Sequence, residues 1–189
     1  AKAVNCEHTV NGDPCCQCPS CLGLESGSFL DVLELDAASN NGVDQVRALR
    51  DEAIYAPANV KKRVYIVDEV HMLSTAAFNA LLKILEEPPA HLMFILATTE
   101  LHKVPATILS RCQRYSFKRI LPKDIAQRLS YVAGQEHIDL TADGAELLSR
   151  LADGALRDGL SLLDQCAAAG GTVDSRAVLE VLGLAGNLQ

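Results

Sequence analysis

The sequence has no long apolar run. No segment approaches the roughly 18 uncharged apolar residues that a membrane-spanning helix needs, and residues 1–6 (AKAVNC) lack the apolar block of a signal peptide. These absences predict a protein without membrane spans and a cytoplasmic location. The sequence also has no initiator methionine, so we expect it to be an excised or processed piece of a longer protein.

Basic residues are scarce as well. The chain has 17 Lys+Arg against 24 Asp+Glu, which gives a net charge of −7. This balance excludes a surface coated in positive charge, so any contact with nucleic acid must be local or shared with neighbouring subunits. With 189 residues, 49% of them hydrophobic, the chain is long enough to bury a core in one large domain or two modest ones.

Cysteines are concentrated near the start of the chain. Four of them follow the spacing C-x8-C-x2-C-x2-C: Cys6, Cys15, Cys18 and Cys21. Glycine and proline residues between them favour the tight turns that wrap a short loop around one ion. We predict a structural zinc ion, because four thiolates leave no open position for a catalytic water. The alternative is a set of disulfides, which two overlapping C-x2-C steps and the predicted location disfavour.

The other cysteines carry weaker signals. Cys16 interrupts the spacing and is predicted to be a free neighbour, while His8 is the one nearby residue that could replace a ligand. Cys112 and Cys166 lie far along the chain and are predicted to be small core residues.

An apolar run at residues 64–67 (VYIV) ends in two acids, Asp68 and Glu69. Four consecutive apolar residues predict a parallel strand that is buried on both faces. Ligands of open α/β sheets bind at the carboxyl ends of the strands, so Asp68 could hold Mg²⁺ while Glu69 orients an attacking water. The alternative is a pair of solvated loop residues.

Strands and helices alternate over the first part of the chain. The expected strands cover residues 29–35, 64–67, 93–97 and 114–117. Between them we expect one helix after the turn at 37–42 and a second that is capped by Ser74 and stopped by Pro88. This order predicts an α/β fold with a parallel, doubly wound sheet.

The second part of the chain predicts a small all-helical domain. From Pro122 onward, apolar residues recur at helical spacing with glycines as breaks. Pro122 suits a first helical turn, and Asp174 can cap the last helix. We therefore expect an α/β domain at 1–119, with the cysteine module at 6–21, and a helical lid domain at 120–189.

Several motifs in one order carry a resemblance to a known family. They are DAAS at 36–39, VYIVDEVHML at 64–73, FNALLKILEEPP at 78–89, FILATTE at 94–100, ILSRC at 108–112, GALRDGLSLLDQ at 154–165 and the cysteine module. In these the chain resembles the γ/τ subunits of the bacterial DNA polymerase III clamp loader, which are AAA+ ATPases of the polymerase holoenzyme. The resemblance covers nearly the whole length and implies ATP-dependent loading of the sliding clamp onto primed DNA.

The resemblance implies roles for individual residues in binding and hydrolysing ATP with Mg²⁺. Asp68 and Glu69 match the Walker B pair. Thr99 matches the sensor that contacts the γ-phosphate, with Thr98 as the near alternative and ordinary strand-end hydrogen bonding as the simpler role.

Two arginines complete the implied site. Arg111 resembles the arginine finger that acts in trans on a neighbouring subunit's nucleotide; an always-charged guanidinium can fork onto phosphate oxygens. Its simpler role is a solvated helix-end arginine. Arg157 resembles the second sensor on the lid, and its alternative is an ion pair with Asp153 or Asp158.

The family also implies partners. These are further γ/τ copies, the δ and δ′ subunits, the sliding clamp and primed DNA, with no membrane. Asn40 and Asn41, with Gly42, Arg47 and Lys83 nearby, match positions that face DNA in the family and could offer backbone amides and charge to phosphates. Lys83 could equally be a solvated surface residue.

One element of the family is missing. The sequence contains no G-x-x-x-x-G-K-[ST] loop, which cradles the phosphates of ATP. Residues 1–6 resemble the end of the helix that follows this loop, so the family's first strand, which lies between the strands ending at Ala97 and Phe117, is also expected to be absent. We therefore expect the fragment alone to be less stable than a complete module and not to hydrolyse ATP.

Two other functions stay open on the sequence. One is a stator subunit that resembles δ′, with the zinc module and the finger but without ATP turnover; the intact Asp68 and Glu69 disfavour it. The other is a stand-alone zinc-dependent nucleic-acid binder, which leaves Arg111 and Arg157 without roles and which the acidic charge does not favour.

Overall fold

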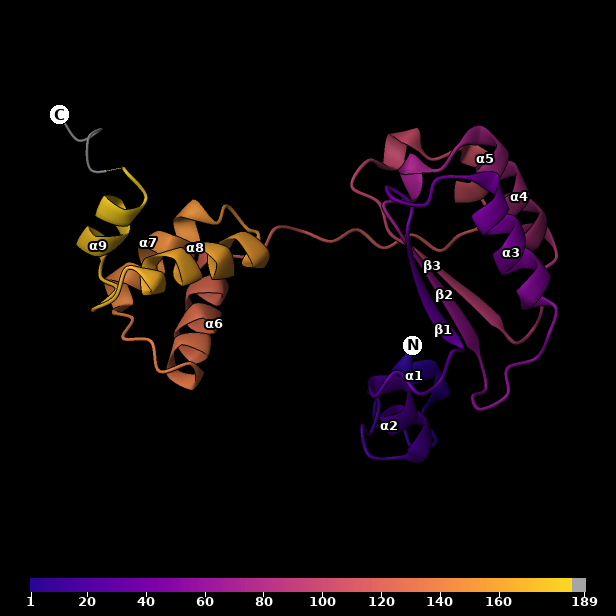
Figure 1. The fold of residues 1–189 in the computed structure, drawn as a ribbon, viewed down its shortest axis with the longest axis horizontal. Helices are drawn as coiled ribbons and strands as arrows, with labels where there is room; N and C mark the ends of the chain where they lie inside the picture. The colour runs from indigo at the N-terminus through magenta and orange to yellow at the C-terminus, as the bar shows by residue number, and fades with distance from the viewer. Residues whose placement is uncertain (185–189) are drawn as a thin grey trace. The chain divides into compact units, whose positions relative to one another are not determined.

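The computed structural model describes residues 1–184, which form two compact units. The first unit covers residues 1–114 and the second begins at Tyr115 (Figure 1). The expected lid domain, 120–189, extends into residues 185–189, which lie outside the described part of the chain.

The first unit is built around a three-stranded parallel sheet. Its strands are β1 (Val32–Asp36), β2 (Arg63–Asp68) and β3 (Leu92–Leu96), in the spatial order β1-β2-β3. Asp36 lies opposite Asp68, and Val67 lies opposite Leu96, so all three carboxyl ends meet at one edge. The predicted parallel α/β fold is confirmed in these residues.

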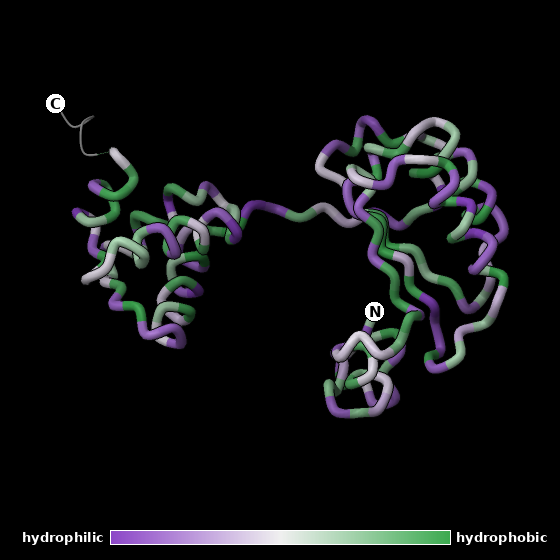
Figure 2. The backbone as a smooth tube through the Cα atoms, viewed as in Figure 1, coloured by the Kyte–Doolittle hydropathy of each residue, from purple (hydrophilic) through white to green (hydrophobic). Residues whose placement is uncertain are grey.

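Two helices, α3 (Val43–Ala53) and α4 (Thr75–Glu86), cover one face of this sheet, as Figure 1 shows. Apolar side chains at helical spacing on these helices pack against alternate residues of the strands. The helices contribute Val46, Leu49, Phe78 and Leu81, and β2 contributes Tyr65 and Val67. The hydroxyl of Ser74 accepts a hydrogen bond from the Ala77 N–H at 3.2 Å, which confirms the predicted cap. Green segments along the strands in Figure 2 mark this apolar layer.

Burial on both faces, expected for the strands, is only partly found. Val64 is fully buried, but Ile66 is half-buried and Ile95, opposite it on β3, is 40% exposed. The reason is that the two hydrophobic clusters around the sheet of the first unit lie on the face that α3 and α4 cover.

The strand expected at 114–117 is not formed, and this prediction was wrong. Tyr115 is 79% exposed and Phe117 is 96% exposed, and the described sheet ends at β3. A strand needs a neighbour to pair its backbone groups, and among residues 1–184 no strand lies beside this segment in the sheet. The first expected strand also starts later than predicted, at Val32.

The connections after β2 and β3 are short helical turns. The first, η1 (Val70–Met72), follows the two acids, and Val70 donates its N–H to the Ala97 carbonyl at 2.9 Å. After β3 come η2 (Leu101–Lys103) and α5 (Ala106–Leu109).

The second unit is all-helical in its described residues. It contains α6 (Pro122–Gln135), α7 (Ala142–Leu151), α8 (Leu156–Ala168) and α9 (Ser175–Val181). Pro122 occupies the first turn of α6, and the Asp174 carboxylate accepts the Ala177 N–H at 2.7 Å, as predicted for both. Ile125, Leu129, Leu148, Leu163 and Val178 form the centre of its core.

The cysteine module precedes the sheet. It holds α1 (Lys2–Asn5) and α2 (Pro19–Glu25). The buried amide of Asn5 accepts the Lys62 N–H at 2.7 Å and donates to the Lys62 carbonyl at 3.0 Å, which fixes the module to the start of β2. No described helix is both long and apolar enough to span a bilayer.

Candidate functional site

The four cysteines of the predicted metal site come together in the structure. Their sulfur atoms all lie within 4.8 Å of one another, and the Cys6 and Cys18 sulfurs are 4.0 Å apart: Cys6, Cys15, Cys18 and Cys21. A tetrahedral ion with metal–sulfur bonds of ~2.3 Å would place its ligands ~3.8 Å apart, so the spacing fits. None of the seven cysteines forms a disulfide.

Backbone N–H groups donate hydrogen bonds to sulfur atoms of this cluster. The N–H groups of His8 and Cys15 donate to the Cys6 sulfur, both at 3.3 Å. The N–H of Glu7 is the main cause that lowers the pKa of Cys18 to about 6, while burial raises the pKa of Cys21 to about 12. Such N–H···S contacts stabilise thiolates, the form that binds a metal. The cluster could therefore hold a metal ion.

The remaining cysteines lie outside the cluster. Cys16 is exposed and has a left-handed backbone (φ 56°), so its side chain is a free neighbour of the site. Cys166 is buried in the core of the second unit, and Cys112 packs against the core of the first, as predicted for both.

The predicted acid pair lies at the carboxyl end of β2. Asp68 is exposed, and its carboxylate accepts the N–H of Glu69 at 2.9 Å. Glu69 has a left-handed backbone (φ 47°, ψ 45°), which is uncommon for a residue other than glycine. Beside them, the Ser39 hydroxyl holds the pKa of Asp36 below its usual range. Carboxylates of two neighbouring strands thus face one edge.

Thr99 contacts Glu69 directly. Its hydroxyl donates to the Glu69 carboxylate at 3.0 Å, across the ends of β2 and β3. Thr98, the alternative candidate, is engaged differently: its hydroxyl accepts the Glu100 N–H at 3.0 Å and lies 2.9 Å from Nδ1 of His71. The structure therefore brings the Thr99 hydroxyl directly to Glu69, whereas the Thr98 hydroxyl contacts Glu100 and His71.

Three members of this network, His71, Glu100 and Lys103, were missed in the sequence. The side chain of His71 is only 6% exposed and lies between the carboxylates of Glu69 and Glu100. Lys103 is the main cause that lowers the pKa of Glu100. The available signal was that His71 follows Glu69 by two residues, one short turn after a strand end.

Arg111 lies apart from this network. Its guanidinium donates to the Thr107 carbonyl at 2.8 Å and pairs with Glu86 at 3.1 Å, and its side chain is 36% exposed. Glu86 is the last residue of α4, and Thr107 is the second residue of the short helix α5. The guanidinium is thus at the surface, where a second molecule can reach it.

Arg157 belongs to the second unit, in the first turn of α8. It is exposed, and among the described residues it pairs with neither Asp153 nor Asp158; Asp153 pairs with Arg119 instead. The alternative role, an ion pair with Asp153 or Asp158, is therefore not found among the described residues.

The residues predicted to face DNA surround the start of α3 and the outer side of α4. Asn40 donates to the Asp36 carbonyl at 3.2 Å, Asn41 accepts the Ser74 N–H at 3.1 Å, and Arg47 pairs with Asp44 at 3.4 Å. Lys83 is exposed on α4. Each of them is at or near the surface, which any contact with phosphate requires.

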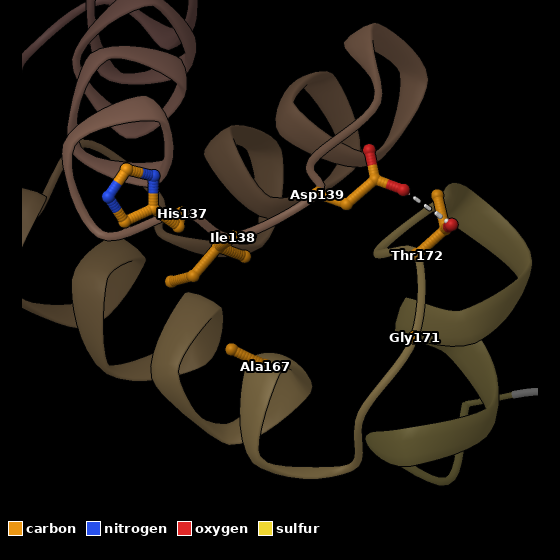
Figure 3. A pocket seen from close by; sticks show the side chains of 6 residues that line it. All are labelled: His137, Ile138, Asp139, Ala167, Gly171 and Thr172. Atoms are coloured by element: carbon orange, nitrogen blue, oxygen red, sulfur yellow. Dashed lines mark hydrogen bonds between the residues drawn. The ribbon is translucent and has the colours of Figure 1, made fainter.

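A cavity of about 380 Å³ lies in the second unit, between the ends of α6 and α8, and Figure 3 shows it. It is lined by His137, Ile138, Asp139, Ala167, Gly171 and Thr172. A hydrogen bond of 2.6 Å joins Thr172 to Asp139 across its rim. None of the predicted site residues lines this cavity.

Family models match both units. Residues 1–121 match the model described as DNA polymerase III, delta subunit. Residues 124–172 match the model described as DNA polymerase III clamp loader subunit, ATPase lid domain.

Relatives match over nearly the whole chain. It is 54% identical to the DNA polymerase III subunit tau of Bacillus subtilis strain 168 over 173 residues, which are 92% of this chain and 31% of that protein. It is 47% identical to the subunit tau of Escherichia coli K12 over 184 residues, 97% of this chain and 29% of that protein. The chain thus spans less than a third of these relatives.

Solved structures share the fold. The RuvB Holliday junction branch migration motor of Thermotoga maritima has a TM-score of 0.68 at 14% identity, over 87% of this chain and 56% of that one. The parallel sheet with acids at its carboxyl edge, followed by a helical lid, is the fold of the AAA+ ATPases. Within that class, the chain belongs to the DNA polymerase III clamp-loader family, and the relatives described above are tau subunits of that family.

Proposed function

We propose that the full-length protein containing this chain is an ATP-hydrolysing subunit of the DNA polymerase III clamp loader, which loads the sliding clamp onto primed DNA. The observation that carries the proposal is the contact of 3.0 Å between Thr99 and Glu69 at the carboxyl edge of the sheet. This contact brings a hydroxyl and a carboxylate from the ends of neighbouring strands side by side, which supports a shared role in positioning the γ-phosphate and the attacking water.

The acids and the threonine have separate roles in this proposal. Asp68 would hold Mg²⁺, and Glu69 would orient the attacking water and accept hydrogen bonds from it. Thr99 would contact the γ-phosphate. A bound triphosphate would supply the bond that breaks, and a bound Mg²⁺ would neutralise the negative charge that develops on the phosphate oxygens. Asp68 suits the metal because its carboxylate is exposed and accepts the N–H of Glu69 through one oxygen, Oδ1.

The arginines would complete the site from elsewhere. Arg111 would act in trans on the nucleotide of a neighbouring subunit, which its surface position supports. Arg157 would reach the nucleotide from the lid, and it has no ion pair among the described residues that would have to break.

Other parts of the chain would serve assembly. We propose an α/β domain at 1–119 and a lid at 120–189, with a structural Zn²⁺ on the cysteine cluster. Contacts with primed DNA would come from Asn40, Asn41, Arg47 and Lys83. The partners would be further γ/τ copies, δ, δ′ and the sliding clamp, in the cytoplasm where replication takes place.

The test uses the full-length protein in its reconstituted complex. Glu69→Gln keeps the size of the side chain and removes its charge, so we expect ATP to bind normally while DNA-stimulated turnover falls by about 100-fold or more. The control is Glu180→Gln, which neutralises an exposed acid on α9 and should leave turnover unchanged. Normal turnover in Glu69→Gln would overturn the assignment of Glu69.

A second candidate is a stator subunit that does not hydrolyse ATP. It is favoured by the match of residues 1–121 to the model described as a delta subunit. If the full-length protein shows no ATPase activity in the complete complex, this candidate replaces the first.

A further inference from the structure

The buried imidazole of His71 joins the ends of two strands. It is carried by η1, which is anchored by the buried Val70, and its side chain is 6% exposed. Nδ1 lies 2.9 Å from the Thr98 hydroxyl and 3.2 Å from the Glu69 carboxylate, and Nε2 lies 3.3 Å from the Glu100 carboxylate. Both ring nitrogens therefore have polar partners, and these come from the ends of both β2 and β3.

The contacts of Thr98 hold this ring in place. The Thr98 hydroxyl accepts the N–H of Glu100 at 3.0 Å and also faces Nδ1 of His71. On the other side of the ring, Glu100 pairs with Lys103 at 2.6 Å. The ring is thus fixed on both sides by groups that follow β3, while it contacts the acid that follows β2.

Glu69 needs such support for two reasons. Its backbone is left-handed, a conformation that persists only where surrounding contacts determine it. Its carboxylate also shares the Thr99 hydroxyl, which has a single proton to donate. If Thr99 donates that proton to a phosphate, as in the proposed function, the carboxylate loses this hydrogen bond and His71 becomes its remaining side-chain contact among the described residues.

We propose that His71 is a positioning residue for ATP hydrolysis, which holds the Glu69 carboxylate in its working orientation while Thr99 contacts the nucleotide. This inference rests on the proposed function. The ring acts through Glu69 and contacts neither the water nor the phosphate. Nδ1 faces both the Glu69 carboxylate and the Thr98 hydroxyl, so the ring links the acid that follows β2 to the end of β3.

The test compares three substitutions in the full-length protein within its reconstituted complex. His71→Asn keeps a polar group near the place of Nδ1, His71→Gln keeps one near the place of Nε2, and His71→Ala keeps neither. We expect kcat to fall about tenfold or more in His71→Ala and His71→Gln, because misplacing a reacting group costs rate steeply. His71→Asn should recover most of this loss. KM and the affinity for nucleotide should change less than about twofold.

Two controls separate positioning from simple packing. His102→Ala removes an exposed imidazole from η2 and should leave kcat unchanged. In the double variant Glu69→Gln with His71→Ala, single-turnover rates should equal those of Glu69→Gln alone, because His71 acts through Glu69.

Each outcome decides the matter. No ATPase activity in the unsubstituted complex overturns the proposed function itself. An active complex with normal kcat in His71→Ala overturns only the role of His71, as does a further loss in the double variant. If His71→Ala does not fold, equal kcat values in His71→Asn and His71→Gln overturn it.

Discussion

Arg111 must leave its resting contacts before it can act on a neighbouring nucleotide. In the structure it pairs with Glu86 at 3.1 Å and donates to the Thr107 carbonyl at 2.8 Å. The side chains of Arg111 and Glu86 are 36% and 47% exposed, so water competes for both charges. An ion pair of this kind contributes only ~0–1 kcal/mol, and the neutral hydrogen-bond partner adds ~1 kcal/mol.

The gain from the proposed role is larger than this cost. An arginine finger accelerates phosphoryl transfer by ~10³ to 10⁵, which corresponds to ~4–7 kcal/mol at 1.36 kcal/mol per decade. The cost of breaking the resting contacts is therefore smaller than the gain in the transition state, so the contact with a neighbouring nucleotide would still lower the barrier. The resting contacts with Glu86 and Thr107 can therefore hold the side chain without blocking its function.

The assay is DNA-stimulated ATP turnover by the reconstituted complex. Arg111→Ala should lower kcat by about 10³-fold or more, with nucleotide binding by the substituted subunit largely unchanged. Arg111→Lys should also be impaired, because an ammonium group cannot fork onto two oxygens. Glu86→Ala removes only the resting contact and should keep turnover within about twofold of normal. Normal turnover in Arg111→Ala would refute the reasoning.

Three further predictions concern stability and metal content. Metal analysis of the purified protein should find about one zinc per chain. The zinc should be lost in Cys18→Ser and kept in Cys16→Ser, and a folded, metal-free protein would contradict this prediction. Asn5→Ala removes two hydrogen bonds to the Lys62 backbone and a third to the Ala1 carbonyl, and should lower the free energy of unfolding by about 1–3 kcal/mol in denaturant titration, whereas no loss would refute the anchor. The Ser175 hydroxyl and N–H hold the pKa of Asp143 well below its usual range. The contribution of the Asp143 carboxylate to the free energy of unfolding should therefore be complete above about pH 4 and decline as pH falls further. Melts of Asp143→Ala should therefore differ from the parent at neutral pH and converge with it in strong acid; a difference that does not depend on pH would exclude this cause.

Features with local causes could be predicted from the sequence. Ser74 and Asp174 cap their helices with their own hydroxyl or carboxylate, and Pro122 starts α6 by its fixed backbone angle. The cysteine cluster was predictable for the same reason, since turns between closely spaced cysteines bring the sulfurs together.

Features that depend on distant partners could not be predicted as well. A strand was expected at 114–117 from its residues alone, but strands form in pairs, and the described sheet ends at β3. His71 was missed because its partners Thr98 and Glu100 are nearly thirty residues away and become visible only when β2 and β3 are in register.

The edge of β3 has a practical consequence for handling this chain. Leu92–Leu96 pairs with β2 on one side, and no other described strand pairs with its second side; Ile95 is also exposed, on a face of the sheet. Unpaired amides and carbonyls with apolar side chains beside them recruit any extended chain, including another copy. Concentrated solutions of the isolated 189 residues should therefore aggregate with a gain in β signal, and an added strand-forming peptide should delay it.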